Sequence, residues 1–294
     1  MKYGVVALIG RPNAGKSSLV NRIMGQKVVI VSNKPQTSWH KIRCVYTDSE
    51  AQIVFVDTPG FHKPLNALGR YMIKSASMAL EECDDILWII DGLHAFSKED
   101  QNIHSLVQNQ PLSFDCVLNK MDQVSPKQQE LLIQKINTTY YPRTVHCTSA
   151  INGDGVEALV HKIKERLIGT SPLYDPEIIV DRPSRFMAAE LIREKIFHYT
   201  EQEIPYNSGV IIEHFQENEN GLLHIRAEVY VLRQNQKGIL IGKQGSRIKQ
   251  IGVEARKDLE YLFDRKVHLE IFIKVKEKWI EKKFIIQNEL EYRE

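Results

Sequence analysis

The chain has 294 residues, of which 43% are hydrophobic and 26% are charged, and its formal net charge is +2. This composition is typical of a globular protein with one large or two ordinary domains, and the small net charge favours neither a nucleic acid nor a membrane as partner. Apolar runs such as "ILWII" at 86–90 are far too short to span a bilayer, and the N-terminus leads directly into a strand rather than a cleavable signal. We therefore expect a cytoplasmic protein whose four widely spaced cysteines are structural thiols.

The first half of the chain alternates short apolar runs with helical stretches. Strands are expected at 3–10, 41–48, 52–57, 86–91, 114–119 and 144–149, and helices near 16–25, 65–83, 97–109, 126–140 and 155–168. This alternation predicts an α/β domain with a mainly parallel six-stranded sheet and helices on both faces. Ligands of such sheets bind outside the carboxyl ends of the strands, where the polar motifs of this half lie.

The second half of the chain has a different pattern of apolar and polar residues. The segment 169–183 contains three prolines and predicts an extended linker. The strands expected at 222–232 and 267–275 alternate strictly, which predicts an α+β domain with helices on one side of its sheet. Before them lies a helix with four apolar positions on one face, Phe186, Ala189, Ile192 and Ile196.

We place a first domain at 1–172, a linker at 173–182 and a second domain at 183–294. The tail 275–294 is expected to form a terminal helix. Trp279 and Phe284 could pack that helix onto the second domain, and packing is favoured for Trp279. The role of three basic residues of the tail stays open: Lys276, Lys278 and Lys282.

A phosphate-binding motif follows the first strand. "GRPNAGKSS" at 10–18 fits G-x-x-x-x-G-K-[ST] between a strand and a helix. Backbone N–H groups at the start of the helix cradle phosphates there, while Lys16 reaches the terminal phosphates and Ser17 supplies a hydroxyl to Mg²⁺. The expected nucleotide-binding residues of this phosphate loop are Gly10, Asn13, Ala14, Gly15, Lys16, Ser17 and Ser18.

"FVDTPG" ends the strand expected at 52–57. Asp57 is expected to hold Mg²⁺, and the Gly60 amide to contact the γ-phosphate. Thr58 and Pro59 lie between them and are included in the predicted nucleotide site. Alone, an Asp-x-Pro-Gly sequence would predict only a turn.

"NKMD" at 119–122, the base loop, follows another strand end. Asp122 can accept two hydrogen bonds from guanine, which adenine cannot donate. Asn119 would tie the base loop to the phosphate loop. The remaining expected contacts are Lys120 along the base, Met121 within the motif, and Ser149 and Ala150 of "TSA", with the Ala150 amide at guanine O6. The motifs together predict a guanine nucleotide site.

A G-x-x-G loop, "GKQG" at 242–245, lies in the second half within a stretch, 233–249, that has five basic residues and no acidic one. Its glycines let a sugar-phosphate backbone approach closely, and the setting predicts a KH-type domain that binds single-stranded RNA. The expected RNA-binding residues are Ile239, Ile241, Gly242, Lys243, Gln244, Gly245, Arg247 and Lys249.

With these motifs in this order, the chain resembles the Era family, in which a GTPase domain is fused to a KH domain. "GRPNAGKSSLVN" is typical of bacterial ribosome-assembly GTPases, and "RPSRFMAAELIREKIF" and "QKGILIGKQGSRIKQIG" resemble Era signatures. The resemblance implies a P-loop GTPase domain, a type II KH domain, slow GTP hydrolysis, and binding to the 3′ end of 16S rRNA in 30S assembly. It also implies weak peripheral contact with the inner membrane, which no clear amphipathic segment supports. We expect a monomer.

Phe61 follows the Asp-x-x-Gly, where a signalling GTPase carries a polar side chain that positions the attacking water. The resemblance implies another arrangement, in which Asn13 of the phosphate loop helps to hold a K⁺ ion that supplies the missing charge. Asn13 could instead merely shape a turn. We expect Lys16, Gly60 and Asn13 to carry catalysis, with K⁺ stimulation as a hypothesis.

The segment 31–43, the switch loop, departs from the family pattern of two threonines before a basic residue. Thr37, Ser38 and Trp39 stand there. Ser38 keeps a hydroxyl and completes the expected Mg²⁺ ligands with Ser17 and Asp57. Trp39 makes the coupling of this loop to the nucleotide state less certain.

Two other functions compete with a GTP-driven RNA switch. One is an RNA chaperone whose first half senses nucleotide without significant turnover. The other is a GTPase that serves membranes or tRNA modification, which fits the first half but leaves the G-x-x-G domain unexplained.

Overall fold

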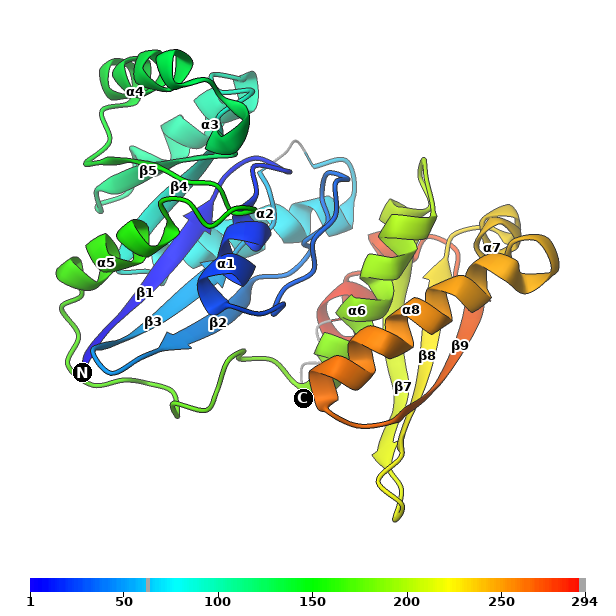
Figure 1. Ribbon diagram of the computed structural model, residues 1–294. Helices are drawn as coiled ribbons and strands as arrows, with labels where there is room; N and C mark the ends of the chain where they lie inside the picture. The colour runs from blue at the N-terminus through cyan, green and yellow to red at the C-terminus, as the bar shows by residue number, and fades with distance from the viewer. Residues whose placement is uncertain (62–63, 291–294) are drawn as a thin grey trace. The chain divides into compact units, whose positions relative to one another are not determined.

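The computed structural model describes residues 1–61 and 64–290 and divides into two compact units. The first contains Met1–Pro64 and Gly69–Asp181, and the second contains Leu65–Leu68 and Arg182–Glu294. Each unit has its own sheet (Figure 1). No helix within the described ranges is long and apolar enough to cross a bilayer.

The first unit is built on a six-stranded sheet in the order β2-β3-β1-β4-β5-β6. Its strands are β1 (Lys2–Ile9), β2 (Ile42–Thr47), β3 (Ala51–Asp57), β4 (Asp85–Asp91), β5 (Phe114–Asn119) and β6 (Val145–Cys147). β2 runs antiparallel to β3, and the other neighbours are parallel. The predicted mainly parallel sheet is therefore confirmed, and the loops after β1, β3, β4 and β5 meet at one edge of it.

Helices cover both faces of this sheet (Figure 1). They are α1 (Lys16–Met24), α2 (Ala67–Glu81), α3 (Lys98–Val107), α4 (Pro126–Tyr140) and α5 (Val156–Arg166). α1 and α5 contact each other on one face, and residues of α2, α3 and α4 pack with the strands in a single hydrophobic cluster on the other. At the centre of that cluster the fully buried Trp88 packs on Tyr140, with ring centroids 4.6 Å apart.

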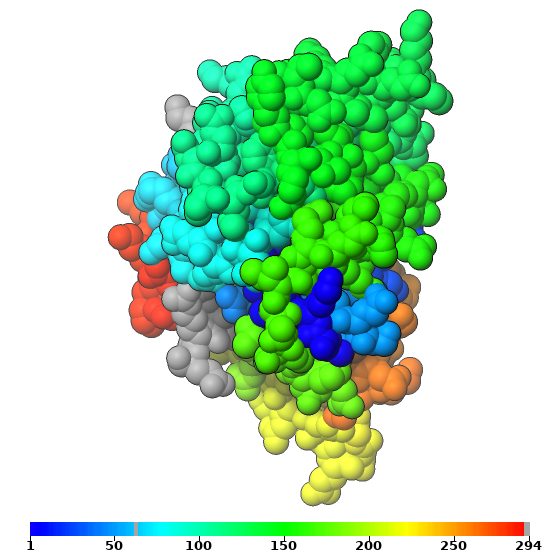
Figure 2. All heavy atoms as spheres, turned by 90° about the vertical axis from the view of Figure 1, so that its left-hand side faces the viewer, coloured from blue at the N-terminus to red at the C-terminus, as the bar shows by residue number. Residues whose placement is uncertain are grey.

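The segment after α5 is held along the first unit rather than hanging free. The backbone groups of Gly169 and Tyr3 exchange hydrogen bonds of 3.0 and 2.8 Å, and Figure 2 shows this green segment beside the dark blue N-terminal residues. The buried Gln52 side chain accepts from the amides of Leu173 and Tyr174 at 3.1 Å. The predicted linker is thus anchored to the sheet near its start.

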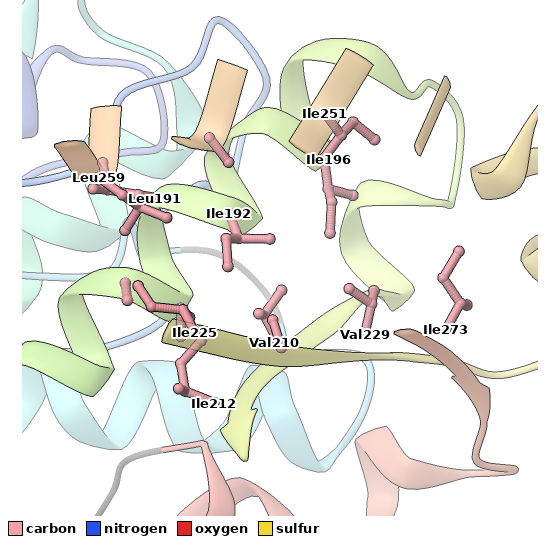
Figure 3. Packing of buried hydrophobic residues seen from close by; sticks show 14 of the residues in the cluster. Leu191, Ile192, Ile196, Val210, Ile212, Ile225, Val229, Ile251, Leu259 and Ile273 are labelled. Atoms are coloured by element: carbon pink, nitrogen blue, oxygen red, sulfur yellow. The ribbon is translucent and has the colours of Figure 1, made fainter. Parts of the chain in front are cut away.

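The second unit has a mixed three-stranded sheet in the order β7-β8-β9. Its elements are α6 (Ser184–Tyr199), β7 (Gly209–Glu217), β8 (Leu223–Val231), α7 (Gln234–Ile241), α8 (Ser246–Phe263) and β9 (Val267–Val275). β7 pairs antiparallel with β8, and β9 pairs parallel with it. α6 and α8 pack on one face of this sheet through residues such as Ile192, Ile225 and Ile251 (Figure 3). This element order is that of the predicted type II KH domain.

The α6 helix differs from the expected one-sided pattern. Ala189, Ile192 and Ile196 join the core cluster, but Phe186 is buried outside it, with the Arg182 guanidinium 4.8 Å from its ring. Charged residues of α6 are buried as well: Glu190 accepts two hydrogen bonds, of 2.7 and 2.6 Å, from Arg193.

The tail is only partly as predicted. Instead of a terminal α-helix, it has a 3₁₀ turn at Trp279–Glu281 and a π-helical turn at Ile285–Glu289. The Trp279 indole is fully buried and donates to the Asn207 carbonyl at 3.1 Å. The predicted packing of Phe284 onto the second domain is wrong, because its side chain is 67% exposed. The last residues of the expected helix, 291–294, lie outside the described residues.

Candidate functional site

The phosphate loop connects β1 to α1 and folds closely against the base loop. Gly15 caps α1 with φ of 93°, and a Cβ at this position would lie 2.1 Å from Asn119 Nδ2. The Lys16 side chain is buried, and its Nζ donates to the carbonyls of Gly10 at 3.0 Å and Arg11 at 3.1 Å. Burial lowers the pKa of Lys16 to about 8. These loop carbonyls hold the ammonium group where phosphate oxygens can replace them.

Three oxygen-bearing side chains converge beside Lys16. Asp57, buried at the end of β3, accepts through Oδ2 from Ser17 Oγ at 2.7 Å and from Ser38 Oγ at 3.5 Å, and the two hydroxyl oxygens lie 3.2 Å apart. Burial raises the pKa of Asp57, and the nearby Lys16 ammonium offsets this only in part. Asp57 Oδ1 is buried without a hydrogen-bond partner among the described residues. Mg²⁺ prefers such oxygen ligands, so the residues fit this ion.

The switch loop distinguishes Ser38 from Thr37. Thr37 Oγ1 donates to the Lys34 carbonyl at 2.8 Å, whereas Ser38 Oγ faces Ser17 and Asp57. Trp39, a departure from the family pattern, is 98% buried and so anchors the loop to the core.

Asn21 is a site residue that the sequence analysis missed. Its Oδ1 accepts from the amides of Val28 at 2.8 Å and Val29 at 2.9 Å, and its Nδ2 donates to the Val29 carbonyl at 2.8 Å. These bonds fix the chain where it enters the switch loop. The final Asn of "GRPNAGKSSLVN" is the sequence signal that could have found it.

The Asp-x-x-Gly segment lies against the phosphate loop. A Cβ on Gly60 would be 2.6 Å from the Pro12 nitrogen, and the Phe61 amide donates to the Gly10 carbonyl at 3.2 Å. The Phe61 side chain is half-buried against the core cluster of the first unit. Asn13, at φ of 62°, reaches the switch loop instead and donates to the Asn33 carbonyl at 2.8 Å.

A cleft is enclosed by the phosphate loop, the switch loop and Gly60. Its lining residues are Pro12, Asn13, Gly15, Lys16, Ser17, Ser18, Ile30, Val31, Ser32, Gln36, Thr37, Ser38 and Gly60. Seven of the residues predicted from sequence therefore line one space: Asn13, Gly15, Lys16, Ser17, Ser18, Ser38 and Gly60.

The base loop folds against the phosphate loop, as expected. Asn119 Nδ2 donates to the Ala14 carbonyl at 3.0 Å, which ties the base loop to the phosphate loop. Asp122 is exposed, so its carboxylate is accessible to a base. The Ala150 amide, expected at guanine O6, donates instead to Asn119 Oδ1 at 3.1 Å.

Four other predicted residues support the loops rather than face the cleft. The Met121 and Pro59 side chains are buried. Thr58 Oγ1 donates to the Leu8 carbonyl at 2.6 Å, and Ser149 Oγ accepts from the Asn152 amide at 3.1 Å.

Asp91, at the end of β4, is a second residue that the sequence analysis missed. Its Oδ2 accepts from Lys120 Nζ at 2.8 Å, and Arg11 Nη2 lies 3.4 Å from the same atom. Burial alone would raise the pKa of Asp91, but the Lys120 hydrogen bond and the nearby cations outweigh burial and lower it. An acidic residue after a strand has no motif of its own, so only its place at the sheet edge could have indicated it.

In the second unit, the G-x-x-G loop joins α7 to α8. Gly242 and Gly245 both have φ of 76°, and a Cβ on Gly242 would lie 2.8 Å from Arg247 Cβ. Lys243 and Gln244 between them are exposed, as is Lys249. Arg247 is turned back, and its Nη1 donates to the Ile239 carbonyl.

A hollow of about 510 Å³ lies beside this loop. It is lined by Arg226, Glu228, Lys237, Ile241, Ile248, Ile271, Phe272, Ile273 and Lys274. Ile241 is where a base-contacting residue was expected, whereas Ile239 is not part of the lining. Most of the lining comes from β8, β9 and α8, which no short motif marks in the sequence.

A phosphate loop, a base loop with a carboxylate, and a G-x-x-G domain together define a GTP-binding protein joined to a KH domain. Matches to two family models agree: "50S ribosome-binding GTPase" over residues 5–120 and "KH domain" over 198–280. The GTPase Era of Thermotoga maritima is 48% identical over 292 residues, which are 99% of this chain and 97% of that protein. The GTPase Era of Thermosipho melanesiensis is 45% identical with the same coverage. The chain belongs to the Era family of GTPases, and it binds and hydrolyses GTP.

Two solved structures are similar over nearly the whole chain. One is Era in complex with MgGDPNP and nucleotides 1506–1542 of 16S ribosomal RNA, at 35% identity and a TM-score of 0.93, covering 99% of this chain and 98% of that one. The other is an Era variant of Aquifex aeolicus bound to GDP·AlF4⁻, at 36% identity, a TM-score of 0.93 and 99% coverage of both chains.

Proposed function

We propose that this chain is a GTP-controlled switch that binds the single-stranded 3′ end of 16S rRNA during assembly of the 30S subunit, as a monomer in the cytoplasm. The observation that carries this proposal is the hollow beside the G-x-x-G loop, which combines apolar walls with a basic rim. A groove of this kind suits unpaired bases and their phosphates. The RNA in the similar Era complex supports the choice of target.

The nucleotide site would work through positioned charges. Lys16 would contact the β- and γ-phosphates, and the amides of the phosphate loop would cradle them. Ser17, Ser38 and Asp57 would hold Mg²⁺, which neutralises charge that develops on the phosphates during transfer. Asn119 would keep the base loop in place. Asp122 would select guanine.

Asn13 would complete the site with K⁺. Its side-chain amide reaches a carbonyl of the switch loop, at Asn33, so one amide and nearby carbonyls could share a monovalent cation above the phosphate loop. A positive charge there would stand where other GTPases use an arginine, which is worth about 10³–10⁵ in rate. Phe61 would then have no catalytic role. Turnover should be faster in K⁺ than in Na⁺ for the natural protein, and equal in both for Asn13→Ala; equal rates in the natural protein would contradict K⁺ stimulation.

RNA binding can be tested with one pair of glycine variants. Gly242→Asp puts a side chain against Arg247 and a negative charge beside the RNA groove. Gly221→Asp adds the same charge at a similar φ of 75°, but in open space at the β7–β8 turn. A short RNA of the 16S 3′-end sequence should bind the natural protein and Gly221→Asp alike, and Gly242→Asp at least about tenfold more weakly. Equal binding by all three would overturn the proposed RNA site.

A further inference from the structure

The hollow of the second unit extends past its helices to the outer surface of the sheet. β9 is an edge strand (Figure 1), and successive side chains along it point to opposite faces. Ile271 and Ile273 therefore face the helices, whereas Phe272 points to the other face, where its side chain is 46% exposed. Because all three line the hollow, an aromatic ring stands at its outer end.

Arg226 of β8 holds a planar group close to this ring. Its guanidinium carbon lies 5.3 Å from the centroid of the Phe272 ring, and its Nε donates to Glu270 Oε2 at 3.4 Å. Arg226 and Glu270 are register partners on the paired strands, so the strand pairing sets this arrangement. An aromatic ring beside an ion-paired guanidinium is a surface on which nucleobases stack.

The two ends of the hollow differ in their net charge. At the outer end each cation has an acidic partner: Arg226 pairs with Glu270, and Lys274 pairs with Glu228. At the helix end, Lys237 belongs to the stretch 233–249, which contains no acidic residue. Phosphates are therefore attracted to the helix end, and the outer end, with its charges balanced, suits the nearly neutral face of a base.

We propose that Phe272, supported by Arg226, is a stacking subsite for one further unpaired nucleobase, next to the roughly four nucleotides that a KH groove holds. This inference rests on the proposed RNA-binding function. The ligand is a single-stranded segment continuous with the RNA in the groove. Because every base has an aromatic face, the subsite accepts any of the four.

The test uses RNA oligonucleotides of the 16S 3′-end sequence, shortened one nucleotide at a time from each end, with the full chain. Phe272→Ala should weaken binding of the longer oligonucleotides by about fivefold or more and leave those confined to the groove unchanged. Phe272→Trp should restore the affinity. Tyr261→Ala is the matched control, because Tyr261 is an exposed aromatic residue of α8 outside the hollow.

A second readout identifies the stacked base directly. 2-Aminopurine, placed at successive positions of the longest oligonucleotide, should be quenched at one end position in the natural protein and in Tyr261→Ala but not in Phe272→Ala. Two results would overturn the subsite while leaving the RNA groove in place. The natural protein could bind short and long oligonucleotides with equal affinity, or Phe272→Ala could lose the same affinity for both. Failure of the natural protein to bind any oligonucleotide would overturn the proposed function, and the subsite with it.

Discussion

Asp91 Oδ2 lies 2.8 Å from Lys120 Nζ and 3.4 Å from Arg11 Nη2, so one buried carboxylate joins the base loop to the phosphate loop. Lys120 has φ of 64°, a conformation that costs a residue other than glycine some free energy. The ion pair with Asp91 helps to hold that conformation. The two halves of the nucleotide site are thus connected through the end of β4.

Asp91→Asn should weaken GDP and GTP binding alike, by about tenfold, because a hydrogen bond between charged groups is replaced by a weaker one. The value of kcat should change little, since Asp91 is not among the residues that line the cleft beside the phosphate loop. Release of a fluorescent GDP, with steady-state turnover, measures both quantities. Asp122→Asn is the contrasting variant, because it should shift preference from guanine to xanthine nucleotides, whereas Asp91→Asn should not. A lower kcat with unchanged affinity would contradict this role.

Lys16 makes nucleotide binding dependent on pH. Burial lowers its pKa to about 8 in the nucleotide-free protein, whereas phosphates favour the charged ammonium and raise the pKa in the complex. Binding should therefore take up a proton near pH 8.5 and none at pH 6.5, and affinity should fall as pH rises through 8. Calorimetry in buffers of different ionisation enthalpy measures this uptake. If nucleotide binding took up the same number of protons at pH 6.5 and pH 8.5, or none at either pH, the lowered pKa of Lys16 would be contradicted.

Ser38 and Thr37 can be separated by their Mg²⁺ dependence. Ser38→Ala removes a hydroxyl 3.2 Å from Ser17 Oγ and should lower Mg²⁺-dependent turnover about 10- to 100-fold. Thr37→Ala removes a hydroxyl that donates within its own loop, to the Lys34 carbonyl, and should have a much smaller effect. Titration of turnover with Mg²⁺ compares the two. A larger loss in Thr37→Ala would make Thr37 the ligand.

Trp279 and Phe284 should differ sharply in their effect on stability. Trp279→Ala removes a fully buried indole and its hydrogen bond to Asn207, at a cost of about 3–5 kcal/mol in the free energy of unfolding. Phe284→Ala should change it by less than about 0.5 kcal/mol, because that side chain is exposed. Urea denaturation followed by circular dichroism gives both values. Equal losses would mean that the tail packs differently.

Sequence patterns were sufficient to locate a residue at the sheet edge where a recognisable motif coincides with the end of a strand. Asp57 and Asn119 follow apolar strands, and a parallel sheet brings such ends together. Asp91 stands at a strand end too, but its partners come from two other loops, which no spacing relates to it. The tail shows the same limit. Trp279 and Phe284 are both aromatic, and the close packing of the Trp279 indole against Gly209, whose added Cβ would lie 3.0 Å from it, cannot be predicted from the tail sequence.

Two residues of the switch loop depart from the family pattern, Ser38 and Trp39. Trp39 was expected to make the coupling of the switch loop to the nucleotide state less certain. In the structure Trp39 is buried and its Nε1 donates to the Gln36 carbonyl at 3.1 Å, which anchors that loop. Whether a residue at such a position faces solvent or the core depends on packing partners distant in sequence. Ser38 Oγ lies 3.2 Å from Ser17 Oγ, and its role as a Mg²⁺ ligand stays a prediction.

The most direct test of a GTP-controlled RNA switch is the affinity of the 16S 3′-end RNA with a non-hydrolysable GTP analogue and with GDP, each at two salt concentrations. Binding should be at least about tenfold tighter with the analogue. The difference should be lost in Gly242→Asp and retained in Gly221→Asp. Equal affinity in both nucleotide states would contradict the switch, even if the RNA groove and the nucleotide site each work as proposed.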